Sequence, residues 1–220
     1  MSTVRKPVSL TFDNGPHPDA TPDVLETLAR HAVRASFFFV GKNLTSTAGQ
    51  DLARRVQAAG HRIGNHTFSH GTPLGERGNP ADAIDEIERA QRLIGPLADA
   101  DRLFRPNGSG GGELDRSLLS TSAYEHLEEG GYTCVLWNSI PGDWHNPDGW
   151  LRHALADVER LGWPLVVIHD LPTGAMRHLE SFILEARNLG AEFTDQFPAD
   201  CVPLVRGKPQ WDVSHLMTET

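Results

Sequence analysis

The chain has 220 residues and a net charge of −9, with 22% charged and 39% hydrophobic residues. This length can bury one substantial core and the composition is ordinary for a globular protein, so we expect one domain over residues 1–220 with its core at about 7–200. The acidic balance argues against nucleic acid, an anionic membrane or a polyanionic glycan as partner, which leaves a neutral substrate as the best fit.

The N-terminal sequence and the two cysteines bear on where the protein resides and on whether it has disulfides or a zinc site. Residues 1–7 contain no apolar stretch resembling a signal peptide, and no run reaches transmembrane length, so we expect a cytoplasmic protein. A chain from which a leader had been removed would show the same pattern, and secretion stays an alternative. Cys134 and Cys201 are too few for a disulfide framework and lack zinc-ligand spacing; we interpret Cys134, in an apolar run, as a buried thiol.

Short apolar runs alternate with amphipathic segments along the chain. Their apolarity is continuous rather than alternating, which is typical of strands buried on both faces. The expected strands are Val8–Phe12, Ala35–Val40, Arg62–Asn65, Leu103–Arg105, Tyr132–Trp137, Leu165–His169 and Ala191–Phe193. The residues after Pro203 are polar, and we expect them to lie over the surface.

Helices are expected between these strands, since three intervening segments carry helix-start signals. Thr21-Pro22-Asp23, Asn79-Pro80 and Asn146-Pro147-Asp148 each place a capping side chain before a proline at the first helical position. The repeating strand–helix order predicts parallel strands with right-handed crossovers. About seven units predict a distorted (β/α) barrel, with an open doubly wound sheet as the alternative.

Polar side chains gather where the expected strands end. They come from five different strands: Asp13, His66, Arg105, Asn138 and His169. Barrel enzymes carry their chemistry at this rim, and the pattern therefore favours the barrel over the open sheet.

The first candidate motif is Thr11–Pro16, which reads TFDNGP. Asp13-Asn14-Gly15 alone is an ordinary turn, since Asn-Gly readily adopts positive φ angles. An apolar strand precedes this turn and Pro16-His17-Pro18 follows it. This context makes the signal for a functional Asp13 more specific than the turn alone would.

The second candidate is the pair His66 and His70. The chain has 11 histidines, so two surface side chains at this spacing are also plausible. The preceding Gly60–Asn65 places the pair after a short strand, at the same rim as Asp13. An acid and two histidines are the residue types that form a hydrolytic metal site with open coordination positions.

Three later motifs complete the set. Arg105–Gly108 is either only a turn before a glycine-rich stretch, or it supplies an arginine that pairs with Asp13 and keeps the carboxyl group of Asp13 ionised. In Asp143-Trp144, the indole of Trp144 either packs in the core or forms a platform on which a sugar ring stacks. His169 ends a buried strand, either as a packed residue or as a general acid.

In this order, the motifs resemble those of the NodB-homology polysaccharide deacetylases (carbohydrate esterase family 4) over roughly residues 7–200. The matching segments are Thr11–Pro16, His66–His70, Arg105–Gly108, Asp143-Trp144 and Ile168-His169. The sequence departs from the family pattern at Asn14, where the family has a second Asp, and at Asn107, where it has Tyr. The family fold, a distorted (β/α) barrel, agrees with the strand pattern.

The resemblance implies a metal-dependent hydrolase that removes N-acetyl groups from amino sugars of a poly- or oligosaccharide, of chitooligosaccharide or peptidoglycan type. It implies Asp13 as the catalytic base, held by Arg105. It implies His169 as the acid that protonates the leaving amine, oriented by Asp143.

The resemblance also implies a substrate groove. A backbone N–H near Asn107 would help to stabilise the oxyanion, Ile168 would border the acetyl pocket and Trp144 would line the sugar groove. Because Asn107 replaces a tyrosine near this groove, we expect substrate choice to differ from that of chitin-type enzymes.

The implied cofactor is a divalent metal ion, with zinc as the expected metal. Its ligands by resemblance are His66, His70 and Asn14, whose neutral amide oxygen replaces a carboxylate. We expect the missing charge to weaken the site, since changes around metal ligands often cost about 10- to 100-fold in affinity.

Two alternatives stay open. One is a metal-free hydrolase of small amides or cyclic imides, against which the intact His66 and His70 argue. The other is a non-catalytic glycan-binding relative, against which Asp13 and His169 argue, since a binding module needs no acid–base pair.

Overall fold

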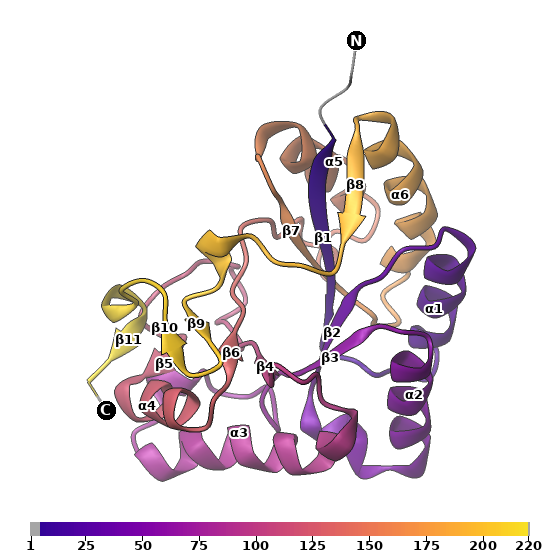
Figure 1. The fold of residues 1–220 in the computed structure, drawn as a ribbon. Coiled ribbons are helices and arrows are strands. Elements are labelled where there is room, and N and C mark those ends of the chain that lie inside the picture. The colour runs from indigo at the N-terminus through magenta and orange to yellow at the C-terminus, as the bar shows by residue number, and fades with distance from the viewer. Residues whose placement is uncertain (1–4, 220) are drawn as a thin grey trace.

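The computed structural model describes residues 5–219, and its centre is a mainly parallel sheet that curls into a distorted barrel (Figure 1). Seven strands run parallel: β1 (Lys6–Asp13), β2 (Ser36–Phe39), β3 (Arg62–Asn65), β4 (Leu103–Phe104), β6 (Thr133–Cys134), β7 (Leu165–His169) and β8 (Ala191–Thr194). Six follow one another in the order β6-β4-β3-β2-β1-β7, and β8 pairs with the first residues of β1. The expected α/β fold class is confirmed.

The barrel closes between β6 and β7 without a continuous ladder. A single parallel bridge joins Ser139 to Val166. Beside it, the Asn138 side chain accepts the Leu165 N–H at 2.8 Å and donates to the Trp163 carbonyl at 3.1 Å. Hydrogen bonds of the Asn138 side chain therefore take the place of backbone hydrogen bonds where the barrel closes between β6 and β7.

The strand expected over Tyr132–Trp137 is shorter in the structure, where β6 ends at Cys134. The buried Arg105 guanidinium donates to the carbonyls of Val135, at 3.0 Å, and Leu136, at 3.3 Å. These carbonyls are thereby taken from the strand ladder, which gives a physical reason for the early end.

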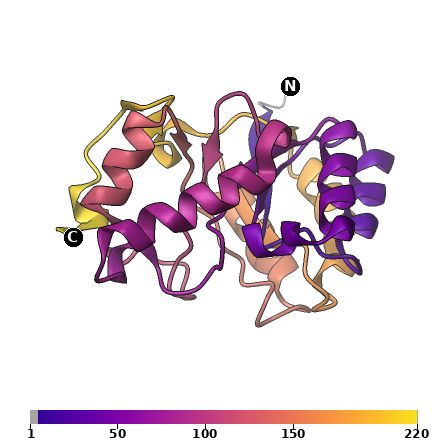
Figure 2. The same ribbon diagram turned by 90° about the horizontal axis from the view of Figure 1, so that it is seen from below.

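Six helices of the described chain cover the sheet: α1 (Thr21–Arg30), α2 (Thr47–Ala58), α3 (Pro80–Ile94), α4 (Thr121–Glu129), α5 (Trp150–Arg160) and α6 (Leu179–Asn188). Seen from below, α3 crosses beneath the barrel (Figure 2). Short 3₁₀ turns lie at Gly41–Thr45, Leu74–Glu76, Gly95–Leu97, Ala175–His178, Ala199–Cys201 and Ser214–Leu216. Among residues 5–219, no helix is long and apolar enough to cross a membrane.

One of the three expected helix starts is confirmed. Asn79 caps α3, since its side chain accepts the Ala81 N–H at 3.1 Å. Thr21 is the first residue of α1 rather than its cap, because its hydroxyl donates to Asp170. Asn146 caps a turn, accepting the Gly149 N–H at 3.0 Å, and α5 begins only after that turn.

Alternate residues of the strands belong to different hydrophobic clusters. In β7, Val166 and Ile168 pack in the cluster that contains residues of α5 and α6, whereas Val167 packs in a second cluster. His169 has the same parity as Val167 and is the register partner of Asp13 in β1. Strand alternation therefore aims Asp13 and His169 at the barrel rim.

The C-terminal segment after Pro203 lies largely on the surface, as expected, but short strands and a few buried apolar side chains attach it to the fold. β9 (Leu204–Val205) pairs antiparallel with β6 and with β10 (Lys208–Pro209), and β11 (Met217–Thr218) pairs with β5 (Leu119–Ser120). Leu204 and Leu216 are fully buried. The segment is anchored at isolated apolar positions, which produce no periodic signal in a polar stretch.

Candidate active site

A cavity of about 320 Å³ lies at the carboxyl ends of the barrel strands. It brings together residues from every motif of the sequence, on strand ends and on the loops that follow them. Its lining comprises Asp13, Asn14, His66, His70, Pro106, Gly108, Gly110, Gly112, Trp137, Ile140, Trp144, Val167, His169 and Leu171.

Asp13 ends β1 and is buried beside Arg105. Its Oδ1 accepts a hydrogen bond from Arg105 Nη1 at 2.7 Å, and its Oδ2 lies 3.6 Å from His66 Nε2. Burial alone would raise the pKa of Asp13, but the positive charge of Arg105 and the neighbouring histidines outweigh it and lower the pKa below 3.8. Asp13 is therefore a carboxylate at neutral pH.

Arg105 lies behind the cavity wall, where it has no exposed surface. Besides Asp13, its guanidinium donates to the Thr11 hydroxyl at 2.8 Å. The guanidinium carbon lies 4.0 Å from the centre of the Phe38 ring. Arg105 therefore holds Asp13 and does not reach the cavity.

His169 ends β7 and is held by the buried Asp143. The Asp143 carboxylate accepts the His169 Nδ1–H at 2.8 Å through one oxygen and the His169 backbone N–H at 2.9 Å through the other. Burial alone would lower the pKa of His169, but the hydrogen bond and charge of Asp143 raise it above 6.5. The imidazole is thus oriented and readily protonated.

His66 and His70 face the cavity from the loop after β3. Their ring centres are 4.9 Å apart. The Nδ1–H of His66 donates to the Arg105 carbonyl at 2.8 Å, which leaves Nε2 free to bind a ligand. Burial lowers the pKa of His66 to about 3 and also lowers that of His70, so both rings are neutral.

Asn14 contributes an amide oxygen to the same space. Its Oδ1 is buried and has no hydrogen-bond partner among the described residues. Within residues 5–219, no three His, Cys, Asp or Glu side chains are placed to hold a metal ion. The neutral donor groups at this cavity are the imidazole nitrogens of His66 and His70 and the amide oxygen of Asn14.

The turn that carries Asn14 is firmly held. Asn14 adopts a left-handed φ of 72°, and the Asn43 side chain donates to its carbonyl at 2.7 Å and to that of Gly15 at 3.2 Å. A Cβ at Gly15 would lie 2.3 Å from the carboxylate oxygens of Asp170, so only glycine fits there.

Asp170 is a buried carboxyl to which the sequence assigned no role. It follows His169 and accepts the Thr21 hydroxyl, and its other oxygen is unpaired within the described chain. Burial raises the pKa of Asp170 to about 7. Its place directly after the histidine motif was the only available signal.

The side chains of two residues expected at the substrate groove do not line the cavity, whereas Pro106 and Gly108 do, so the expected role of a backbone N–H near Asn107 stays a prediction. Successive side chains of β7 point to opposite sides, and that of Ile168 points away from the rim, so Ile168 is fully buried in the core. Val167 lines the cavity instead. Asn107 is also buried, and its amide donates to the Gly71 carbonyl at 2.9 Å. Asn107 therefore ties the loop after His70 to the loop after β4.

Trp144 lines the cavity as expected and meets the His169 ring edge-on, with centres 5.1 Å apart. Trp137 is a second indole, which was expected as the last residue of a strand. Its Nε1–H donates to the Gly112 carbonyl at 2.8 Å and so holds the glycine-rich loop at the cavity. Aromatic and glycine surfaces together suit the stacking of a sugar ring.

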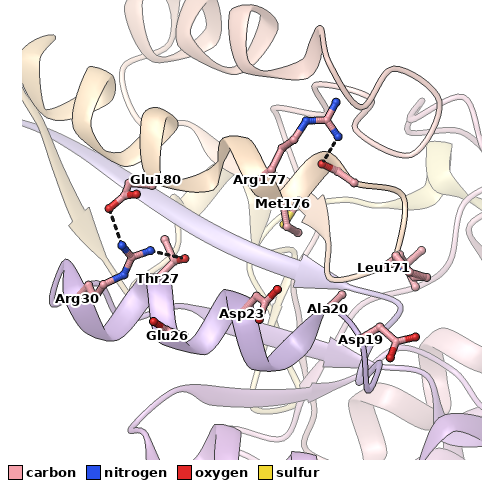
Figure 3. A pocket seen from close by; sticks show the side chains of 12 residues that line it. Asp19, Ala20, Asp23, Glu26, Thr27, Arg30, Leu171, Met176, Arg177 and Glu180 are labelled. Carbon is pink, nitrogen blue, oxygen red and sulfur yellow. Dashed lines mark hydrogen bonds and ion pairs between the residues drawn. The ribbon is translucent and has the colours of Figure 1, made fainter.

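A second, larger cavity of about 540 Å³ shares Leu171 with the first (Figure 3). It lies between α1 and the chain after β7, and its wall carries the exposed ion pair of Arg30 with Glu180. We place the active site in the smaller cavity, since that one holds the buried ionisable pairs.

Comparison with known proteins identifies the fold and the family. The family model for polysaccharide deacetylases matches residues 1–126. A chitooligosaccharide deacetylase of Bradyrhizobium sp. (strain ANU 289) is 39% identical over 174 residues, which cover 77% of this chain and 74% of that protein. A peptidoglycan-N-acetylglucosamine deacetylase of Bacillus cereus (strain ATCC 14579) is 28% identical, with 75% and 73% covered.

Among solved structures, the family 4 carbohydrate esterase from Streptomyces lividans in complex with acetate superposes with a TM-score of 0.72 at 25% identity, covering 90% of this chain and 96% of that one. Fold, family model and relatives agree with the resemblance of the sequence motifs. The chain belongs to the polysaccharide deacetylase family.

Proposed function

We propose that this chain hydrolyses the N-acetyl amide of amino sugars in a poly- or oligosaccharide, of the chitooligosaccharide or peptidoglycan type on which its relatives are named to act. The observation that carries the proposal is a pair of ionisable groups on one cavity, Asp13 bonded to Arg105 at 2.7 Å and His169 bonded to Asp143 at 2.8 Å. Asp13 is held as a carboxylate, and His169 is held ready to be protonated. Hydrolysis of an amide needs both a base and an acid.

Asp13 acts as the base. Its Oδ1 is occupied by Arg105, so Oδ2 takes a proton from water as the water oxygen bonds to the acetyl carbon. Arg105 keeps the carboxylate ionised and fixes its plane through the hydrogen bond at 2.7 Å. Arg105 acts through Asp13 and is a positioning residue.

His169 acts as the acid. It gives its Nε2 proton to the amine nitrogen as the carbon–nitrogen bond breaks, and acetate and a free amino sugar leave. Asp143 fixes the ring through Nδ1, so that Nε2 carries the transferable proton toward the cavity. Trp144, edge-on to the ring, narrows the space in which the sugar lies.

Deacetylases of this family generally depend on a metal, and the residues present fit a divalent ion, which we propose to be zinc. Two neutral imidazoles and the unpaired, buried oxygen of Asn14 form a donor set with open positions. A bound ion would polarise the acetyl carbonyl and acidify a water molecule. His66 and His70 would hold it, with Asn14 as the weaker ligand.

The test is acetate release from a panel of N-acetylglucosamine oligomers and peptidoglycan fragments, with zinc present and after chelation. We expect release from at least one glycan and its loss after chelation. The matched control is Asp13→Asn on the same substrates. Hydrolysis of small cyclic imides by the chelated protein, without acetate release from any glycan, would contradict the proposal.

A further inference from the structure

We propose that Glu86, a residue of α3 outside the cavity, is a positioning residue for the His66–His70 segment and sets the affinity of this histidine pair for a metal ion. The inference rests on the proposed function, because it assumes that the pair binds a metal.

Glu86 binds the segment through both carboxylate oxygens. Oε2 accepts two consecutive backbone N–H groups, from Phe68 at 3.1 Å and from Ser69 at 2.8 Å. Oε1 accepts the Ser69 hydroxyl at 2.9 Å. Glu86 is only 6% exposed, so these bonds are partly shielded from water.

The segment needs such an acceptor because its backbone is irregular. Thr67 and His70 have left-handed φ angles of 63° and 51°, which non-glycine residues rarely adopt. Within residues 5–219, no strand pairs with Phe68 or Ser69 to accept their N–H groups. A buried N–H without a partner is costly, and Glu86 supplies the partner for both.

The hydrogen bonds continue past His70. The Ser69 hydroxyl oxygen accepts the Gly71 N–H at 3.1 Å, so the network started by Glu86 covers the residue on each side of His70. On the other face of the segment, Lys42 donates its backbone N–H to the Phe68 carbonyl at 2.8 Å and its Nζ to the Ser69 carbonyl at 2.9 Å. Glu86 therefore holds the donors, and Lys42 the acceptors, of one loop.

The charge of Glu86 is balanced outside the cavity. Arg77 Nη2 lies 3.3 Å from Oε1, and the Arg89 guanidinium lies over the Phe68 ring at 3.6 Å. Glu86 also sits on the buried face of α3 beside Ile87 and Ala83. A carboxylate is unusual there, and the hydrogen bonds to the histidine segment explain it.

Zinc titration by calorimetry of the full-length protein, freed of metal by chelation, tests the inference. We expect Glu86→Ala to raise the zinc Kd by about 10- to 100-fold, the scale known for residues that orient metal ligands. Glu86→Gln keeps acceptor oxygen for the N–H groups but not the charge, so it should restore part of the affinity.

Glu88→Ala is the matched control. Glu88 lies on the same helix and accepts hydrogen bonds from His126 at 2.9 Å and from the Tyr132 hydroxyl at 3.3 Å, but it makes no hydrogen bond to the histidine segment. We expect it to lower thermal stability without changing the zinc Kd. If Glu86→Ala does not fold, Ser69→Ala removes one contact of the same carboxylate and should raise the zinc Kd several-fold.

The outcomes separate the two proposals. Wild-type protein that binds no zinc overturns the proposed metal site and this inference with it. Tight binding by wild type and equal binding by the Glu86 and Ser69 variants overturns this inference alone. A similar loss in Glu88→Ala would also overturn it, because the effect would then follow helix stability rather than contact with the segment.

Discussion

The two sides of the cavity are built in different ways. Asp13 and His169 are register partners at the ends of β1 and β7, which pair over five residue pairs. His66 and His70 follow the four-residue strand β3, on a loop with two left-handed residues. The sheet itself places the proposed acid–base pair, whereas side chains from α3 and from other loops place the histidine pair. Changes on the strand side should therefore affect proton transfer, and changes around the loop should affect metal affinity.

The largest effect is expected on the strand side. Asp13→Asn and His169→Ala should each lower kcat by about 10²-fold or more, because each removes one proton-transfer group. Both side chains lie at strand ends, so circular dichroism should show an unchanged fold. Near-normal kcat in either variant, measured on the glycan with the fastest acetate release, would show that its role is wrongly assigned.

The second prediction concerns the pH dependence of the strand side. With the pKa of Asp13 lowered below 3.8 and that of His169 raised above 6.5, kcat/KM should fall only outside this window. Asp143→Asn removes the charge that raises the pKa of His169, so burial then dominates and lowers it. The alkaline limb should therefore move to lower pH, with reduced activity at neutral pH.

Asp148→Asn is the control for this shift. Asp148 is an exposed carboxylate five residues further along, paired with Arg177 and His178 rather than with His169. Its removal should leave both limbs in place. An unmoved alkaline limb in Asp143→Asn would mean that another group supplies the proton.

Sequence reasoning was most successful where local pattern decides the structure. Strands β3 and β7 have the predicted bounds, and the arginine expected to pair with Asp13 does so at 2.7 Å. Both rest on features that act locally: continuous apolar runs, and residue types at strand ends. The same signals placed His66, His70 and His169 at one cavity.

The errors arise where tertiary contacts decide. Ile168 was assigned to the groove by resemblance, but the alternation of β7 turns it into the core. Glu86 gave no sequence signal and Asp170 only its place after His169, because their partners are backbone or hydroxyl groups that are distant in the chain. The C-terminal strands are two residues long, too short for any periodic pattern.

The third prediction tests the loop side through its weakest ligand. Asn14→Asp should lower the zinc Kd by about tenfold or more, because a charged oxygen replaces the amide oxygen, which has no partner within the described chain. Calorimetric titration of both proteins gives the comparison. Equal or weaker binding by the Asp variant would place Asn14 outside the coordination sphere and leave the histidine pair without a third protein ligand.

The smallest expected effect concerns the chemical stability of the turn between the two sides. Asn-Gly is prone to deamidation, which requires the Gly15 nitrogen to reach the Asn14 side-chain carbonyl carbon. Asn43 fixes both carbonyls of this turn, at 2.7 Å and 3.2 Å, so deamidation at Asn14 should be slow in the folded protein. Asn43→Ala frees the turn and should speed deamidation during storage, as measured by peptide mapping.

Asn107-Gly108 is the internal control, because the Asn107 amide is bonded to Gly71 and does not contact Asn43. Equal rates at Asn14 in wild type and Asn43→Ala would show that the turn is held by the barrel alone.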